Sequence, residues 1–151
     1  MANSVCEVLL TEVQLCVPDS RLDAESGAAV DFRGIVRGSE DGREIEGIVY
    51  DAHREMAEHQ LRQIADQAGI QFRLRSVIIY HRIGFVAVGE TSLFTRVCSG
   101  HRPAAFRASQ WIVDELKKKV PIWKRPKFKG ASITGPGSSS SAAASAAALA
   151  K

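Results

Sequence analysis

The stretch KKKVPIWKRPKF, residues 117–128, sets an apolar tetrapeptide between two groups of positive charge. Upstream of it, apolar residues recur at helical spacing as far as Val120. Because the residue before a proline is pushed away from helical angles, Pro121 predicts that the helix stops at Val120. The stretch therefore predicts a helix that ends abruptly and is followed directly by a strand or loop.

The apolar tetrapeptide also has a consequence for the charges on either side of it. Ile122 and Trp123 are expected to anchor the segment after the helix against the body of the protein. Lys124 would then be held close to the lysines at the helix end, which predicts one preorganised cationic pocket. Two simpler interpretations stay open. The helix-end lysines can be cations favoured by the helix dipole, and Trp123 can be an ordinary core residue.

The helix before the proline has a continuous apolar stripe, formed by Ala105, Ala108, Ile112, Val113, Leu116 and Val120. At about 100° per residue, Lys118 points away from this stripe, whereas Lys117 and Lys119 flank it. A flanking lysine can lay its stem on the core and hold its ammonium at the edge of a cleft. Periodicity alone slightly favours Lys119 over Lys117 as the more inward side chain.

Strand-like and helix-like patterns alternate along the rest of the chain. Strands are predicted over 7–17, 28–38, 44–52, 73–89 and 90–100, and helices over 53–69 and 101–120. The second and third strands are expected to pair as an antiparallel hairpin. Gly69 is expected to end the first helix, and Pro103 to lie in the first turn of the second. This order predicts an α+β fold with a mostly antiparallel sheet and two main helices.

Length and composition suit one compact domain. The chain has 151 residues, of which 45% are hydrophobic, enough for a sizeable core. We predict a domain over residues 1–134 and a disordered Ser/Ala-rich tail over 135–151. The net charge is only +3, but residues 117–129 hold seven basic side chains and no acidic one. Such a cluster predicts an anionic ligand or partner.

Several classes of protein are excluded because the sequence lacks their motifs. Cys6, Cys16 and Cys98 have neither metal-binding nor redox spacing, so they are expected to be thiols in a reducing compartment. The chain shows no signal-peptide pattern and no apolar run long enough to span a bilayer, which predicts a cytoplasmic protein without membrane contact. It also lacks a glycine-rich nucleotide loop, a nucleophile elbow and a His/Cys metal set. We expect neither a metal nor a cofactor.

Three further cationic positions can serve an anionic ligand. His101 and Arg102 precede the second helix, whose N–H groups favour anions, and Arg102 can bind a phosphate or carboxylate through two N–H groups. An exposed Arg102 beside a capping His101 is the alternative. Arg37 ends a strand next to a glycine, where a ligand can approach the backbone closely. The pair His81 and Arg82 is expected to be structural.

Four fragments stand in a characteristic order: FRGIVRG, YHRIGFVAVGE, SGHRPAAFRA and LKKKVPIWKR. In this order and spacing they resemble the MoaE family, the large catalytic subunit of molybdopterin synthase, over about residues 27–125. The resemblance implies an α/β hammerhead fold and a homodimer, each end of which binds a small ubiquitin-like sulfur carrier of the MoaD type that ends in Gly-Gly. It implies that this subunit transfers sulfur from the carrier's C-terminal thiocarboxylate to cyclic pyranopterin monophosphate. The product is the dithiolene of molybdopterin, and the metal enters later.

The resemblance also implies roles for individual residues. Lys117 and Lys124 match the catalytic lysines, so motif spacing selects Lys117 where helical periodicity leaned toward Lys119. The positions that match substrate-binding segments are Ile35, Val36, Arg37, His101, Arg102, Arg125 and Pro126. Among these, His101 and Arg102 match the anion site for the pterin phosphate, which a second copy of the chain can contribute.

The chain departs from the family's pattern after the fragment WKR. Pro126 stands where the family usually has an acidic residue, and Ile133 stands approximately where it has a tryptophan. The Ser/Ala segment replaces a charged segment that closes over the carrier's tail. These departures concern the lid over the site and the affinity for the carrier more than the chemistry. Two alternatives stay open: a family member that binds the carrier without catalysis, and a nucleic-acid-binding module that uses the basic cluster. The leading interpretation has no nucleic-acid partner.

Overall fold

Eight strands and two helices make up the part of the chain that the computed structural model describes, residues 4–19 and 23–130. In chain order they are β1 (Val5–Thr11), β2 (Ala28–Ile35), β3 (Ser39–Glu40), β4 (Arg43–Ala52), α1 (Arg54–Gln71), β5 (Ser76–Arg82), β6 (Gly84–Ala87), β7 (Thr91–Ser99), α2 (Arg102–Lys119) and β8 (Ile122–Phe128). The predicted α+β fold with two main helices is confirmed. The predicted tail over 135–151 and Ile133 lie outside the described residues.

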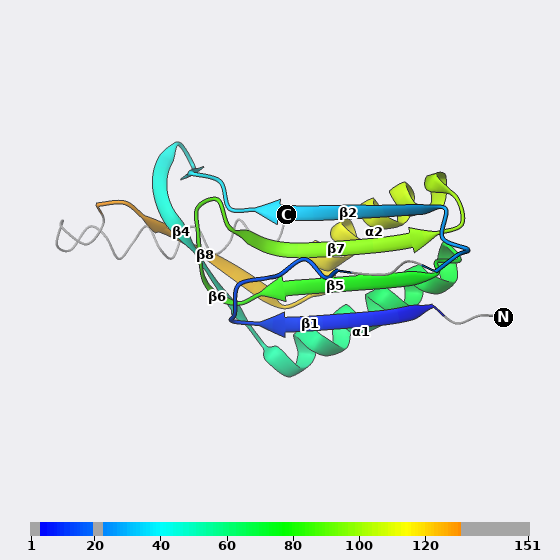
Figure 1. Cartoon of the computed structure of the whole chain (residues 1–151). Helices are drawn as coiled ribbons and strands as arrows, with labels where there is room; N and C mark the ends of the chain where they lie inside the picture. The colour runs from blue at the N-terminus through cyan, green and yellow to red at the C-terminus, as the bar shows by residue number, and fades with distance from the viewer. Residues whose placement is uncertain (1–3, 20–22, 131–151) are drawn as a thin grey trace.

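The larger of two sheets carries the main core. Its strand order is β1-β5-β7-β2, with β1 parallel to β5 and the other two pairings antiparallel. Figure 1 shows α1 and α2 together behind one face of this sheet. Both helices bury residues at spacings of three and four, such as Leu61 and Ile64 in α1 and Ile112 in α2. These apolar stripes pack against the inward-facing side chains of the sheet.

The second sheet stands at one end of the first (Figure 1). Its central strand is β4, which pairs antiparallel with β3, β6 and β8. The sheet has a small core of its own, formed by Val36, Ile45, Ile48, Val86 and Phe128. Only Val120 and Pro121 separate α2 from β8, so the end of α2 is fixed beside this second sheet.

The predicted hairpin between the second and third strands is wrong. β2 pairs with β7, and β4 pairs across the polar loop with the two-residue strand β3. The loop does form a tight turn, in which Asp41 and Gly42 have φ values of 52° and 75°. The turn therefore joins β4 to β3, and β2 is left to pair with a strand more than fifty residues away in the sequence.

Two predicted boundaries are also wrong. The first helix continues past Gly69 to Gln71, and a Cβ atom at Gly69 would lie 2.5 Å from the Oγ of Ser4. This glycine therefore permits close packing of the N-terminal segment and does not end the helix. The first strand ends at Thr11, well before residue 17, because its parallel partner β5 ends opposite at Arg82.

Candidate active site

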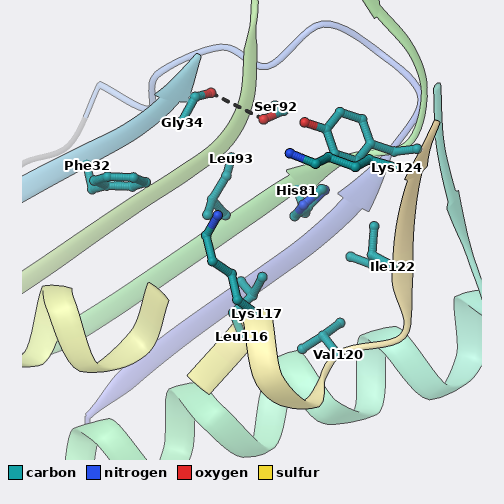
Figure 2. A pocket seen from close by; sticks show the side chains of 11 residues that line it. Phe32, Gly34, His81, Ser92, Leu93, Leu116, Lys117, Val120, Ile122 and Lys124 are labelled. Carbon is teal, nitrogen blue, oxygen red and sulfur yellow. Dashed lines mark hydrogen bonds between the residues drawn. The ribbon is translucent and has the colours of Figure 1, made fainter. Parts of the chain in front are cut away.

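Two adjoining hollows open where the end of α2 meets the second sheet. Their volumes are about 100 and 220 Å³, and both are lined by Gly34, Tyr50, Ser92, Lys117 and Lys124. These residues come from β2, β4, β7, α2 and β8. We call the two hollows the lysine pocket, because Lys117 and Lys124 extend into the same space from different elements (Figure 2). The predicted convergence of these two lysines is therefore present within one chain.

Lys117 lies in the last turn of α2, which ends where the sequence predicts. Val120 has extended angles (φ −85°, ψ 126°), and its N–H donates to the carbonyl of Leu116. Lys118 and Lys119 both pair with Glu115, at 3.5 and 2.8 Å. The structure therefore selects Lys117 as the inward lysine. The slight preference of the helical periodicity for Lys119 is wrong, since Lys119 is held by a carboxylate one turn back.

Lys124 is directed inward by the alternation of β8. Ile122 and Pro126 are buried on one face of this strand, and Lys124 lies between them on the same face. The Lys124 ammonium lies 3.2 Å from the carboxylate of Glu40. Glu40 is also 3.5 Å from the Arg37 guanidinium, and its own side chain is only 17% exposed. One nearly buried carboxylate thus holds two cations at the rim of the pocket.

The apolar tetrapeptide of residues 120–123 is anchored through Ile122, as predicted, but not through Trp123. Ile122 is 8% exposed, whereas Trp123 is 49% exposed. The Pro121 carbonyl accepts a hydrogen bond from the His53 N–H at 3.2 Å, which attaches the helix end to the start of α1. Successive strand residues face opposite sides, so burial of Ile122 forces Trp123 outward. Trp123 is therefore neither the predicted anchor nor a core residue.

The predicted strand-end segment also lies at the pocket. Ile35, Val36 and Arg37 line the larger hollow together with both lysines. Val36 is buried in the second core, and the Arg37 side chain is largely exposed. Five of the nine predicted site residues thus surround one cavity, although they come from segments about 80 residues apart in the sequence.

The other four predicted residues lie elsewhere in the same chain. Arg125 points to the outer face of β8 and donates to Asp51 at 2.8 Å, while Pro126 is buried opposite Ile48. His101 and Arg102 begin α2, and the helical rise of 1.5 Å per residue puts Arg102 about 22 Å along the axis from Lys117. A single chain therefore does not bring His101 or Arg102 to the lysine pocket.

The basic cluster of residues 117–129 is almost fully neutralised by the fold. The pairs are Lys118 and Lys119 with Glu115, Lys124 with Glu40, Arg125 with Asp51, Lys127 with Glu46, and Lys129 with Glu44. Within the described chain, Lys117 alone among the seven cluster residues has no carboxylate partner. A cationic surface balanced in this way is poorly suited to bind a nucleic-acid backbone.

Three polar residues of the pocket were not singled out as site residues by the sequence. Burial raises the pKa of Tyr50, and a hydrogen bond with Ser92 opposes this shift. The Ser92 hydroxyl also donates to the Gly34 carbonyl at 3.3 Å. Burial is also the main cause that lowers the pKa of His81, to about 4. The inward direction of His81 could have been predicted from strand alternation, because Val77 and Ile79 precede it on the same face of β5.

Neither a membrane-spanning helix nor a metal-binding cluster is present in residues 4–19 and 23–130. No helix in these ranges is long and apolar enough to cross a membrane. No group of three or more His, Cys, Asp or Glu side chains in them could hold a metal ion.

Comparison with known proteins identifies the family of this chain. A family model described as MoaE protein matches residues 9–119. The chain belongs to the MoaE family. A curated relative from Thermoplasma volcanium, named molybdopterin synthase catalytic subunit, is 41% identical over 101 residues, which cover 67% of this chain and 74% of the relative. The prediction of a MoaE-type catalytic subunit, an enzyme, is confirmed at the level of the family.

Solved structures support the same MoaE fold. The crystal structure of molybdopterin synthase from Staphylococcus aureus has a TM-score of 0.74 and 30% identity, and the match covers 82% of this chain and 91% of that one. A Helicobacter pylori structure, a complex of subunits 1 and 2 of molybdopterin-converting factor, has a TM-score of 0.62 at 20% identity and covers 83% of this chain and 86% of that one. The second likeness shows the fold alone. The family model matches residues 9–119 and does not reach the catalytic candidate Lys124, so the candidacy of Lys124 rests on the resemblance of the fragment LKKKVPIWKR and on the pocket geometry.

Proposed function

We propose that this MoaE chain transfers sulfur from the C-terminal thiocarboxylate of a small ubiquitin-like carrier to cyclic pyranopterin monophosphate, forming the dithiolene of molybdopterin. Lys117 and Lys124 are the catalytic residues of this proposal. The observation that carries it is that both lysines line one cavity with the strand-end residues 35–37. We expect the reaction to take place in the cytoplasm, as the sequence predicts.

The charges of the pocket suit the two substrates. A thiocarboxylate tail and a pterin phosphate are both anions, and each needs cations in a partly buried site. Lys117 has no carboxylate partner within the described residues, so its ammonium is available to a ligand. It can exchange a proton during attack or stabilise the tetrahedral intermediate at the thiocarboxyl carbon. Lys124 can orient and polarise the same carbon.

The shape of the pocket suits the end of the proposed carrier. The hollow of about 100 Å³ is lined by apolar groups such as Leu93 and Ile122 as well as by the lysines. The last two residues of a tail ending in Gly-Gly carry no side chains, so this end can enter a narrow hollow that would reject larger residues. This supports a carrier of the MoaD type as the partner.

The position of Arg102 supports a homodimer. If His101 and Arg102 bind the pterin phosphate as the family resemblance implies, they have to act about 22 Å along α2 from Lys117 of their own chain. A second copy can supply them to the first copy's pocket. We therefore include in the proposal a symmetric dimer whose sites are each completed by the other chain.

The test is a conversion assay with a thiocarboxylated carrier and the cyclic pterin. We expect Lys117→Ala and Lys124→Ala each to lower kcat by about 100-fold or more with an unchanged melting temperature. Lys119→Ala is the matched control, because Lys119 is paired with Glu115 outside the pocket, and we expect it to retain wild-type turnover. Full turnover by the Lys117→Ala variant would refute the catalytic role. Carrier binding without any turnover by the wild type would support the non-catalytic alternative.

A further inference from the structure

His81 lies in the lysine pocket although the sequence suggested only a structural role for it. It is the last inward-facing residue of β5, after Val77 and Ile79, and its side chain is 5% exposed. It lines the smaller hollow together with Lys117 and Lys124. Figure 2 shows His81 among the lining residues, between Leu93 and Ile122.

The hydrogen bonding of the ring determines where its proton is. The Nδ1 atom of His81 lies 2.7 Å from the Arg82 carbonyl oxygen. A carbonyl oxygen only accepts hydrogen bonds, so Nδ1 carries the proton and donates it. Arg82 is itself fixed by an ion pair with Glu90 at 2.9 Å. In the neutral ring, Nε2 is then left with a lone pair and can only accept.

The ring is neutral at physiological pH. Burial, assisted by the positive charge of Lys117, lowers the pKa of His81 to about 4, against the hydrogen bond to Arg82, which raises it. The other titratable groups that line the same hollow are Lys117 of α2, Tyr50 of β4 and Lys124 of β8. The Tyr50 ring meets His81 edge-on, with centroids 5.3 Å apart.

These groups differ in whether they already have a partner. The Tyr50 hydroxyl interacts with Ser92, which lowers the pKa of Tyr50 against the effect of burial, and Lys124 is paired with Glu40. Within residues 4–19 and 23–130, the Lys117 ammonium has neither a carboxylate partner nor a hydrogen-bond acceptor. An ammonium group has three donors and no lone pair. The pocket thus combines one donor group without an acceptor and one acceptor atom, Nε2 of His81, without a donor assigned to it.

We propose that His81 is a positioning residue for Lys117, whose ammonium donates one hydrogen bond to Nε2 and is thereby aimed at the bound ligand. The two remaining N–H groups of Lys117 then point into the pocket. The hydrogen bond from Nδ1 to the Arg82 carbonyl keeps Nε2 as the acceptor. Because the ring is neutral, it does not repel the Lys117 ammonium. This inference rests on the proposed function of Lys117.

Two amide variants separate this role from a structural one. In His81→Asn the amide can still donate to the Arg82 carbonyl but has no atom at the place of Nε2. In His81→Gln the amide oxygen reaches that place and can accept from Lys117. We expect His81→Asn to lower kcat by about 10- to 100-fold, the effect of losing one hydrogen bond to a charged group. His81→Gln should recover at least half of the wild-type kcat, while KM for the pterin changes little in both.

A spectroscopic measurement tests the contact without turnover. In the nitrogen NMR spectrum of the whole chain, we expect His81 to show a protonated Nδ1 and an unprotonated Nε2 at pH 7. Lys117→Met should shift the Nε2 resonance and leave Nδ1 in place, whereas the control Lys119→Met should shift neither. An unchanged Nε2 resonance in Lys117→Met, or equal activities of the Asn and Gln variants, would overturn the proposal. A wild type without turnover would refute the proposed function alone, since the NMR result stands independently.

Discussion

The Lys124 ammonium lies 3.2 Å from the Glu40 carboxylate, which comes from the short strand β3. Glu40 is mostly buried and also contacts Arg37 at 3.5 Å. In the absence of a ligand, it therefore supplies the negative charge that an anionic substrate would bring. A ligand that binds Lys124 and Arg37 has to compete with this internal counter-ion.

Removal of this counter-ion should strengthen anion binding. We expect Glu40→Gln to tighten binding of a peptide ending in Gly-Gly about three- to tenfold, because Lys124 is no longer paired. Titration calorimetry at constant ionic strength measures this. Glu46→Gln, which frees only Lys127 outside the pocket, is the control and should change nothing. Weaker binding by Glu40→Gln would mean that Glu40 mainly orients Lys124.

Ile122 and Trp123, the two large residues of the apolar tetrapeptide, should differ in how much they stabilise the fold. Ile122→Ala should lower the free energy of unfolding by about 2–4 kcal/mol, because it leaves a cavity beside α2. Trp123→Ala should cost less than about 1 kcal/mol, because half of this side chain is exposed. Urea unfolding at pH 7 gives both values. Equal losses in the two variants would contradict the placement of Trp123 on the outer face.

The buried His81 should make stability depend on pH. Its pKa is about 4 in the folded chain against 6.5 when exposed, so the unfolded state binds more protons between these values. Stability is then complete above pH 6.5 and falls as the pH drops toward 4, by about 3 kcal/mol. Denaturant unfolding between pH 7 and 4.5 should show this fall in the wild type and a clearly smaller one in His81→Gln. Parallel pH profiles would show that folding does not lower the pKa of His81.

The proposed sharing of sites between two chains predicts complementation. Arg102→Ala and Lys117→Ala should each be inactive as pure dimers. After the two variants are mixed and allowed to exchange, half of the dimers should contain both chains, and each of these has one intact site. We therefore expect about a quarter of the wild-type activity. A mixture of Lys117→Ala and Lys124→Ala is the control, because both residues belong to one chain's pocket, and it should regain none.

The sequence was sufficient for features that depend on neighbouring residues. The end of α2 at Val120 follows from the steric demand of Pro121, and the inward direction of Lys124 follows from strand alternation once Ile122 is buried. The choice of Lys117 over Lys119 came from motif spacing, and helical periodicity alone was misleading. Glu115 decides it, because this carboxylate holds Lys119 on the outside.

Other errors concern partners distant in sequence. The pairing of β2 with β7 could not be predicted from the loop after β2, because a tight turn specifies only the two short segments that it joins. Gly69 looked like a helix end because its contact is with Ser4, on a different element. Tyr50 and Ser92 carried no motif, and only strand packing places them in the pocket.

By itself, the sequence determined the family, the α+β class and the helix end, and it predicted that Lys117 and Lys124 converge on one pocket. Residues 117–129 contain no acid. The tertiary structure alone decided that four of their cations, Lys124, Arg125, Lys127 and Lys129, pair with carboxylates of β3 and β4. The tertiary structure also decided that Lys117 and the neutral His81 line the same hollow. The physical reason is that charges interact through space over a few ångströms, and these distances are set by the pairing of strands far apart in the chain.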